Sequence, residues 1–400
     1  MKTVADKRID DIEALRAIAV AITILDHLPH LFPWHISGVS HVLKWFNFWS
    51  GVDLFFAISG FVIARGLFGQ LEAVKDSDTY WRNMIAFWIR RFYRIWPSSL
   101  LWMVVVVLLS AALRNTGLMM SVRSNFADLT AVVLQVANFH WAYCHAVNRA
   151  YCGDIGVWWS LSLEEQFYLA IPILMWVMRK RLPYFLGAVV LIQMFLDRPF
   201  LGPLWYVRTD SICFGVLLAY FERTTLYKDV KPVFMERRWI AIPLVGFSVV
   251  LLASLAQSFT DKPVIVPFTT GLIAAISAFL VFIGSYNNDY IVRSKALKPI
   301  VLWAGSRSYS IYLIHLPTIV MTKALWRFIE PSGTVFTGNY FLRFFFVWLA
   351  MTLILSELNY RLLEQPFRIN GRDAPRRFRN GNAPVLSTGR EAAKNVVMQD

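Results

Sequence analysis

The stretch Glu13–His30, EALRAIAVAITILDHLPH, decides the fold. It is apolar and long enough to cross about 30 Å of hydrocarbon at about 1.5 Å per residue, so it predicts a membrane helix. Arg16 and His27 share one helical face and are separated by about 16 Å along the axis. A central Arg or Asp costs about 2.5–3.5 kcal/mol on insertion, so Arg16, Asp26 and His27 indicate a site inside the protein. The alternative is an Arg16 that snorkels to the membrane edge and an inert interfacial histidine.

The composition excludes an ordinary soluble protein. Of 400 residues, 57% are hydrophobic and 16% aromatic, whereas a soluble domain has about 45–50% apolar residues. The formal charge of +14 lies mainly between the apolar segments, where membrane topology explains it better than nucleic-acid binding does. The sequence predicts an all-α polytopic membrane protein with no nucleic-acid partner and no metal.

Ten apolar segments are candidate transmembrane helices. An even number places both termini on one side of the membrane. Most Lys and Arg residues outside the spans then lie on that same side, so the positive-inside rule predicts that both termini are cytoplasmic. We expect a multi-pass protein of the bacterial inner membrane, with spans at about residues 12–32, 46–64, 97–113, 160–178, 183–197, 204–222, 239–256, 264–284, 300–322 and 339–360.

The predicted outer loop, residues 114–157, is the longest before the C-terminal tail. We interpret Phe126–Tyr143 as an amphipathic segment at the outer face, because an eleventh span here would reverse the charge bias. Cys144 and Cys152 lie in this loop, in a compartment predicted to be oxidising. The sequence is compatible with a disulfide between them and with two free thiols.

The end of the chain differs in composition from the rest. From Gly371 it is polar and basic and has no apolar period. We therefore expect a membrane domain over residues 1–370 and a disordered cytoplasmic tail over residues 371–400.

Polar side chains inside the spans mark further candidates. Asp53 lies in the second span, in GVDLFFAISGF, where an unpaired carboxylate is costly. Arg208 and Asp210 begin the sixth span, and each is expected to pair with another helix. His315 lies in the ninth span, in SRSYSIYLIHLP, and helix packing and function are equally open for it.

An arginine cluster precedes the third span in FWIRRFYRIWPSS. Arg91 and Arg94 are spaced i,i+3 and Arg90 and Arg94 i,i+4, just before Pro97, which is expected to begin the span. One interpretation is a stop-transfer cluster on the cytoplasmic side. The other is a polyphosphate site, because guanidinium groups bind phosphates bidentately and coenzyme A carries such phosphates.

The fourth span opens with WWSLSLEEQFY. Ser162 and Glu165 fit a capping box, in which the serine bonds the first turn and the glutamate reaches back. That interpretation leaves Glu164 free for a site.

Seven stretches together resemble the acyltransferase family 3 membrane proteins, which O-acylate surface polysaccharides, lipid-linked sugars and some small molecules. The resemblance implies an acyl-CoA donor, usually acetyl-CoA, bound from the cytoplasm, and an acceptor hydroxyl on the outer side. Some relatives carry an additional soluble hydrolase-like domain, so we expect the membrane domain here to act alone or with a separate partner. The stretches cover about residues 10–368 and are, in order, LRAIAVAITILDH, GVDLFFAISGF, RRFYRIWP, WSLSLEEQFY, RTDSICFG, SYSIYLIHLP and ELNYRLLEQP.

The family's motifs fall on residues already singled out. This chain has Asp26 where relatives often carry an apolar or aromatic residue. The arginine–ten residues–histidine motif falls on Arg16 and His27, the RxxR motif on Arg91 and Arg94, and the WSLSxE motif on Trp159–Glu164.

Acyl transfer to a sugar hydroxyl needs a base and a place to stabilise the oxyanion. We expect His27 to be the base, because an imidazole exchanges protons near neutral pH. A nearby carboxylate would fix its tautomer. Glu164 and Asp53 are favoured for that role over Asp26, which points about 100° away from His27.

The remaining candidates divide between donor and acceptor. The expected partners are acetyl-CoA, a glycan or lipid-linked sugar, membrane lipids and polysaccharide-assembly proteins. We expect the donor phosphates to contact Arg16, Arg90, Arg91 and Arg94, and the acceptor to contact Trp159, Arg208, Asp210 and His315.

Two other functions are compatible with these features. In a transporter or flippase of a polysaccharide intermediate, the same charged face would line a permeation path. No repeated halves support that interpretation. A non-catalytic scaffold of a polysaccharide-assembly complex is the other alternative, and it predicts that loss of His27 leaves acylation intact.

Overall fold

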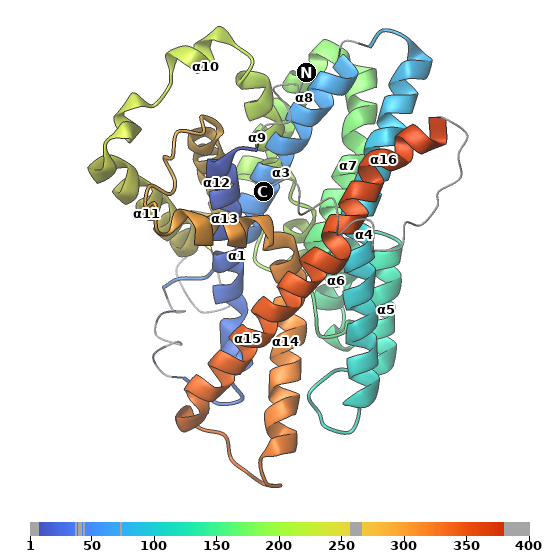
Figure 1. Ribbon diagram of the computed structural model, residues 1–400, viewed down its shortest axis with the longest axis vertical. Helices are drawn as coiled ribbons and strands as arrows, with labels where there is room; N and C mark the ends of the chain where they lie inside the picture. Colours follow the sequence, from blue (N-terminus) through green and yellow to red (C-terminus); the bar gives the residue numbers. More distant parts are fainter. Residues whose placement is uncertain are drawn as a thin grey trace.

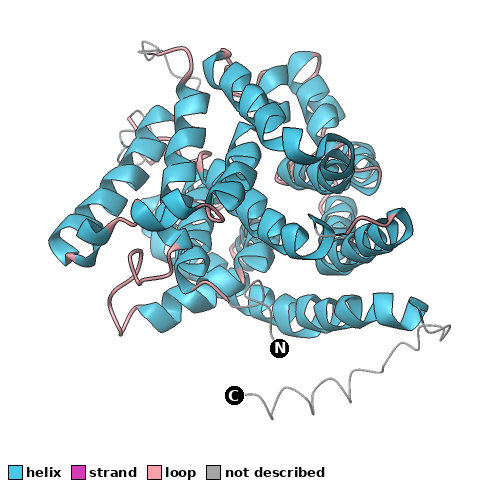
Figure 2. Ribbon diagram, turned by 90° about the horizontal axis from the view of Figure 1, so that it is seen from above, coloured by secondary structure: helices cyan, strands magenta, loops and turns pink. Residues whose placement is uncertain are grey.

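A computed structural model of the protein describes residues 8–36, 38, 42, 45–72, 74–256 and 266–379. Within these ranges the chain forms helices, turns and loops and no strand (Figure 2), so the all-α prediction is confirmed there. The helices are α1 (Asp10–His27), α3 (Gly51–Leu67), α4 (Ser77–Ala112), α5 (Val122–Val133), α6 (Ala137–Ala146), α7 (Trp158–Met178), α8 (Leu182–Phe195), α9 (Asp210–Phe221), α10 (Thr225–Asp229), α11 (Arg238–Leu255), α12 (Thr269–Ser285), α13 (Lys298–Ser306), α14 (Ser308–Ile329), α15 (Phe341–Asn359) and α16 (Gln365–Arg379).

Five helical stretches of the described chain are long and apolar enough to cross a membrane. Helix α12 is apolar but shorter, and α1 has three acidic residues in its first turn. The ten spans and the cytoplasmic position of both termini therefore stay predictions. The five stretches are Gly51–Glu72, Ser77–Ala112, Trp158–Phe195, Arg238–Leu255 and Gly338–Pro375.

Helix α4 differs from its predicted span. It begins at Ser77, not at Pro97, and Pro97 lies inside it. The whole helix is 36 residues long. Asp76 caps its first turn by accepting a hydrogen bond from the backbone N–H of Thr79 at 2.8 Å. The prediction of an inner loop up to Pro97 is wrong, because hydropathy detects only the apolar second half of a capped, half-polar helix.

Two other predicted spans are divided by breaks in the helix. The predicted span 204–222 begins in a 3-10 turn, Pro203–Val207, and continues as helix α9 only from Asp210. Residues 300–322 comprise most of α13 and the first part of α14, which are separated at Arg307.

Helices α3 and α9 touch backbone to backbone. A Cβ atom on Gly60 of α3 would lie 2.1 Å from the carbonyl oxygen of Ile212, and one on Gly215 of α9 would lie 2.2 Å from the carbonyl oxygen of Ala57. Only glycine permits so close an approach. Helices α1 and α12 also pack on this pair.

Helices α15 and α16 form one long rod, drawn in orange to red across the front of Figure 1. A π-helical turn, Tyr360–Glu364, joins them, and α16 packs along α4. Helix α16 continues past the predicted tail boundary at Gly371 to Arg379, and the division into a membrane domain and a tail stays a prediction. The rest of the predicted tail, residues 380–400, lies outside the described residues.

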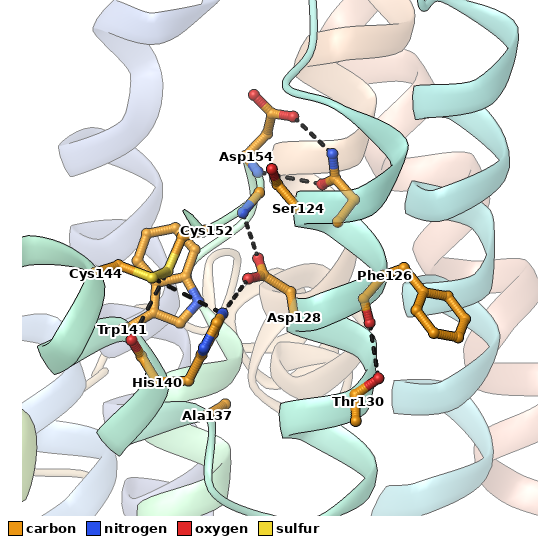
Figure 3. Close-up of polar contacts among 12 residues, drawn as sticks. Ser124, Phe126, Asp128, Thr130, Ala137, His140, Trp141, Cys144, Cys152 and Asp154 are labelled. Atoms are coloured by element: carbon orange, nitrogen blue, oxygen red, sulfur yellow. Dashed lines mark hydrogen bonds and ion pairs between the residues drawn. A yellow bond between two sulfur atoms is a disulfide. The ribbon is translucent and has the colours of Figure 1, made fainter. Parts of the chain in front are cut away.

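The predicted amphipathic segment forms parts of two helices, α5 and α6, separated by a turn in which Gln135 has a φ of 56°. A disulfide joins Cys144 and Cys152. Asp128 on α5 lies 2.9 Å from Nε2 of His140 on α6, and the two helices face each other across this pair (Figure 3). The disulfide and this pair hold the segment together.

Candidate active site

A cavity between α1, α3, α4, α7 and α14 brings together residues from five separate parts of the sequence. It contains about 780 Å³ of space between atoms, part of it open to solvent. One part of its wall is apolar and comes mainly from α3, and the other part is polar. The lining residues are Arg16, Val52, Phe55, Phe56, Ile58, Ser59, Val62, Ile63, Arg91, Arg94, Ile95, Ser160, Leu161, Glu164, Tyr168, Ser308, Tyr309 and Tyr312.

Three of the four arginines predicted to bind the donor line this cavity. Arg16 donates a hydrogen bond to Glu13 at 2.9 Å. Arg91 and Arg94 lie one turn apart on α4, and neither forms a hydrogen bond or ion pair with any described residue. The Arg91 guanidinium lies over the ring of Tyr168, 5.6 Å from its centroid. Two guanidinium groups are thus available for an anion in the cavity.

Arg90 is the fourth predicted donor ligand, and the structure places it outside the cavity lining. Its guanidinium instead donates a hydrogen bond to the side chain of Gln70, on the turn that follows α3. Its position on α4 differs from that of Arg91 by about 100° around the helix axis, which explains the separation.

Glu164 lies in the cavity wall, where its Oε1 accepts hydrogen bonds from the hydroxyl groups of Ser59 and Tyr168. The predicted capping box is wrong, because α7 already begins at Trp158. Ser162 instead accepts a hydrogen bond from the backbone N–H of Ala137 at 3.3 Å. Tyr168 was not among the predicted site residues, although its spacing i,i+4 from Glu164 places both on one face.

The structure places Asp53 against Arg208 and not against His27. Its two carboxylate oxygens accept hydrogen bonds from Arg208 at 2.9 and 3.0 Å. The Arg208 guanidinium also lies 3.9 Å from the ring centroid of Trp205 and 4.8 Å from that of Trp159. The predicted acceptor ligands Arg208 and Trp159 are therefore engaged with each other and with Asp53.

Asp210 forms the second buried ion pair, with Arg198 at 2.6 Å. Arg198 lies in the loop after α8, so the expectation that Asp210 pairs with another helix is wrong. The expectation was correct for Arg208, whose partner Asp53 lies on α3. Neither Arg208 nor Asp210 lines the cavity.

His27 ends helix α1 and meets His315 of helix α14. Nδ1 of His27 lies 2.9 Å from the carbonyl oxygen of Thr23 and 3.4 Å from Nε2 of His315. Glu164 does not contact His27 either, and Asp26 accepts a hydrogen bond from the backbone N–H of Phe48 at 3.1 Å. The side chain next to His27 is therefore an imidazole from a distant helix and not one of the three carboxylates considered for it.

The cavity ends one helical turn short of the two histidines. Tyr312 lines the cavity and precedes His315 by one turn of α14. Its hydroxyl group lies 2.7 Å from the Ser160 hydroxyl, and its ring packs edge-on against Phe55 at 5.9 Å between centroids. Phe55 and Tyr312 thus contact each other in the cavity wall, one turn of α14 before His315.

Most of the chain matches a known protein family. A family model described as an acyltransferase domain matches residues 9–356. The chain belongs to acyltransferase family 3. The resemblance of the seven stretches to this family is therefore confirmed.

Two relatives of this acyltransferase family 3 chain show how its length compares. It is 27% identical to the peptidoglycan O-acetyltransferase OatA of Listeria monocytogenes, over 91% of this chain and 56% of the relative. It is 25% identical to the O-acetyltransferase OatA of Staphylococcus aureus, over 92% of this chain and 59% of the relative. The chain thus spans less than two thirds of the length of these relatives. No solved structure matches it.

Proposed function

We propose that the protein is a membrane O-acetyltransferase that transfers the acetyl group of cytoplasmic acetyl-CoA to a sugar hydroxyl of a surface polysaccharide, exopolysaccharide or lipid-linked glycan. Its place would be the bacterial inner membrane. Membership in the acyltransferase family supports the reaction class. The name of the Listeria relative adds peptidoglycan to the candidate acceptors.

The cavity arginines are the observation that carries this proposal. Among the described residues Arg91 and Arg94 form no ion pair, although they lie beside a cavity inside a helix bundle. The carboxylates of Glu164, Glu165 and Glu364 act on their charge only without direct contact. An unpaired guanidinium in such a place is costly, so a bound anionic ligand is the simplest compensation. The phosphates of coenzyme A supply that charge, and the apolar wall from α3 suits the pantetheine arm.

The proposed chemistry takes place at His27. Its imidazole accepts the proton of the acceptor hydroxyl while the hydroxyl oxygen attacks the carbonyl carbon of the thioester. The carbon–sulfur bond then breaks, and the imidazolium returns the proton to the coenzyme A thiolate. The products are an acetyl ester and coenzyme A.

The donor must reach from the arginines to His27, a distance of about 16 Å along α1. Phe55 and Tyr312 line the cavity in contact with each other, and Tyr312 lies one turn of α14 before His315. The proposed function therefore requires these two side chains to move when the donor binds, as lids and loops commonly do in enzymes.

Donor binding tests this proposal directly. We compare Arg94→Ala with Arg90→Ala in purified protein in lipid nanodiscs, because both lose one positive charge from α4 and only Arg94 lines the cavity. We expect Arg94→Ala to weaken acetyl-CoA binding about 10- to 100-fold, the worth of a charge-assisted hydrogen bond of about 1.5–3 kcal/mol. Arg90→Ala should bind normally. Equal affinities of wild type and Arg94→Ala would contradict the donor site.

Turnover separates an enzyme from a transporter or a scaffold. Purified protein with radiolabelled acetyl-CoA should hydrolyse the donor slowly or transfer the label to an added glycan. His27→Ala should lower the transfer rate about 100-fold or more, the usual contribution of a general base. A protein that neither consumes nor transfers the label would not be an acetyltransferase.

A further inference from the structure

Two imidazoles from opposite ends of the chain meet beside the cavity. His27 on α1 and His315 on α14 are 288 residues apart in sequence, and Nε2 of His315 lies 3.4 Å from Nδ1 of His27. Their ring centroids are 5.1 Å apart, with an interplanar angle of 63°. The two rings thus meet edge-on, with one nitrogen of each close enough for a long hydrogen bond.

The neighbouring carbonyl groups determine which nitrogen carries the hydrogen. Nδ1 of His315 lies 2.8 Å from the carbonyl oxygen of Tyr312 and 3.2 Å from that of Ile311. Nδ1 of His27 lies 2.9 Å from the carbonyl oxygen of Thr23. Carbonyl oxygens only accept, so each Nδ1 carries the hydrogen in the neutral ring. Nε2 of His315 then has a lone pair, which faces the Nδ1–H of His27.

We propose that His315 is a positioning residue for His27. It accepts part of the Nδ1–H hydrogen bond of His27, holds that ring in the Nδ1–H tautomer and leaves Nε2 of His27 free to take the proton of the acceptor hydroxyl. His315 would thus have the part that a carboxylate has in a Ser-His-Asp triad. This inference rests on the proposed function and deepens it.

The surroundings fit a fixed partner better than a substrate ligand. His315 is fully buried, and its own carbonyl oxygen accepts a hydrogen bond from Nε1 of Trp348 at 3.0 Å. Among the described residues, Nε2 of His27 has no hydrogen bond. Other titratable side chains around the pair are Asp26, which is bound to the Phe48 N–H, His30, whose ring centroid lies 6.3 Å from that of His27, Tyr312, whose ring centroid lies 6.0 Å from that of His315, and Lys323 near His30.

In the proposed reaction one proton passes through His27, and none passes through His315. The acceptor proton moves to Nε2 of His27 and forms an imidazolium, whose Nδ1–H remains shared between Thr23 and His315. The positive charge strengthens that hydrogen bond. When the carbon–sulfur bond breaks, the Nε2 proton moves to the coenzyme A thiolate. His315 stays neutral throughout and neither gains nor loses a proton.

Two amide substitutions separate the roles of the two His315 nitrogens. The terminal amide of Gln reaches the position of Nε2, whereas that of Asn reaches the position of Nδ1. His315→Gln can therefore still present an acceptor to His27, and His315→Asn cannot. We expect kcat within about 10-fold of wild type for His315→Gln and a loss of about 100-fold or more for His315→Asn. The KM for acetyl-CoA should not change in either variant, because His315 does not line the cavity.

The tautomer of His27 gives a measurement that needs no substrate. In ¹⁵N-histidine-labelled full-length protein, with His27 assigned from the His27→Gln variant, we expect a protonated Nδ1 and an unprotonated Nε2. His315→Asn should add the other tautomer, and His315→Gln should not. A wild-type His27 protonated at Nε2 would overturn the inference even if no His315 variant could be purified.

The outcomes distinguish this inference from the proposed function. Active enzyme with equal kcat in wild type and His315→Asn would refute the positioning role and leave the acetyltransferase intact. If no form of the protein transferred acetyl groups, but His315→Asn still changed the tautomer, the function would fail and the histidine pair would stand. Acetyl-CoA binding by each variant confirms that the fold is retained.

Discussion

Asp53 and Arg208 form an ion pair in which neither side chain is accessible to solvent. Such a pair contributes little net stability, but the loss of one partner leaves a buried, uncompensated charge and costs about 3–5 kcal/mol. We therefore expect Asp53→Asn to lower stability by that amount. Thermal unfolding in detergent measures it, with the exposed Asp78→Asn as the control. An Asp53→Asn protein of normal stability but greatly reduced kcat would restore Asp53 as a catalytic candidate.

Adjacent glutamates on α7 give a second comparison between residues. Glu164 holds the hydroxyl groups of Ser59 and Tyr168 at the cavity wall, whereas Glu165 has an Oε1 with no hydrogen-bond partner and does not line the cavity. Charge-assisted hydrogen bonds are worth about 1.5–3 kcal/mol. We expect Glu164→Gln to lower kcat/KM about 10-fold or more and Glu165→Gln to change it less than about 3-fold. The reverse order would show that the wrong glutamate was chosen.

Local spacing predicted some of these residues and failed for others. Arg91 and Arg94 were found because both lie on one helix and their spacing alone places them on one face. The partner of His27 was not found, because α1 and α14 are brought together only by the tertiary fold. Asp53 shows the same limit, since its position in the span was evident and its partner was not.

Among the elements, the unit formed by α5, α6 and the loop up to Val157 has a testable pH dependence. Burial raises the pKa of Asp154 above its usual value, although hydrogen bonds from the Met120 N–H and from Asn125 lower it. Folding therefore favours the protonated form of the Asp154 carboxyl. The resulting contribution to the free energy of unfolding is complete below about pH 3.9, and it is lost as the pH rises through the raised pKa of the folded protein.

We expect the Asp154→Asn variant to become more stable relative to wild type as the pH rises from about 4 to 7, because Asn cannot ionise. The difference in unfolding temperature between the two proteins measures this, and comparison at each pH cancels the titration of other groups. A difference that is constant with pH, or that favours wild type at pH 7, would contradict it.

Element boundaries were predicted well where a polar segment separates two apolar ones and poorly elsewhere. The predicted spans 160–178 and 183–197 match α7 and α8 within a few residues. Helix α4 was cut short, since its first half is polar and becomes helical through the Asp76 cap and packing against α16. The break at Arg307 within the ninth span has no proline to mark it.

At the scale of the whole molecule, the orientation in the membrane is the main prediction still to be tested. The charge bias places residue 120 outside and residue 230 inside. We expect Met120→Cys to react with a membrane-impermeant thiol reagent in intact cells, and Val230→Cys to react only after the inner membrane is opened. Cys213 is buried and serves as the background control. Labelling in the opposite order would reverse the predicted topology and the proposed side of donor entry.

The glycine contact between α3 and α9 limits where the bundle can open. With Gly60 and Gly215 seated against the opposing main chain, these two helices behave as a single stationary block, and Ser59 is fixed beside it. Any widening that admits the proposed donor would then come from α1, α4, α7 or α14, which carry Arg16, Arg94, Glu164 and Tyr312 and line the same cavity. The groups proposed to contact the donor would then move together with these helices. Binding of the ligand and widening of the cavity would therefore be a single movement.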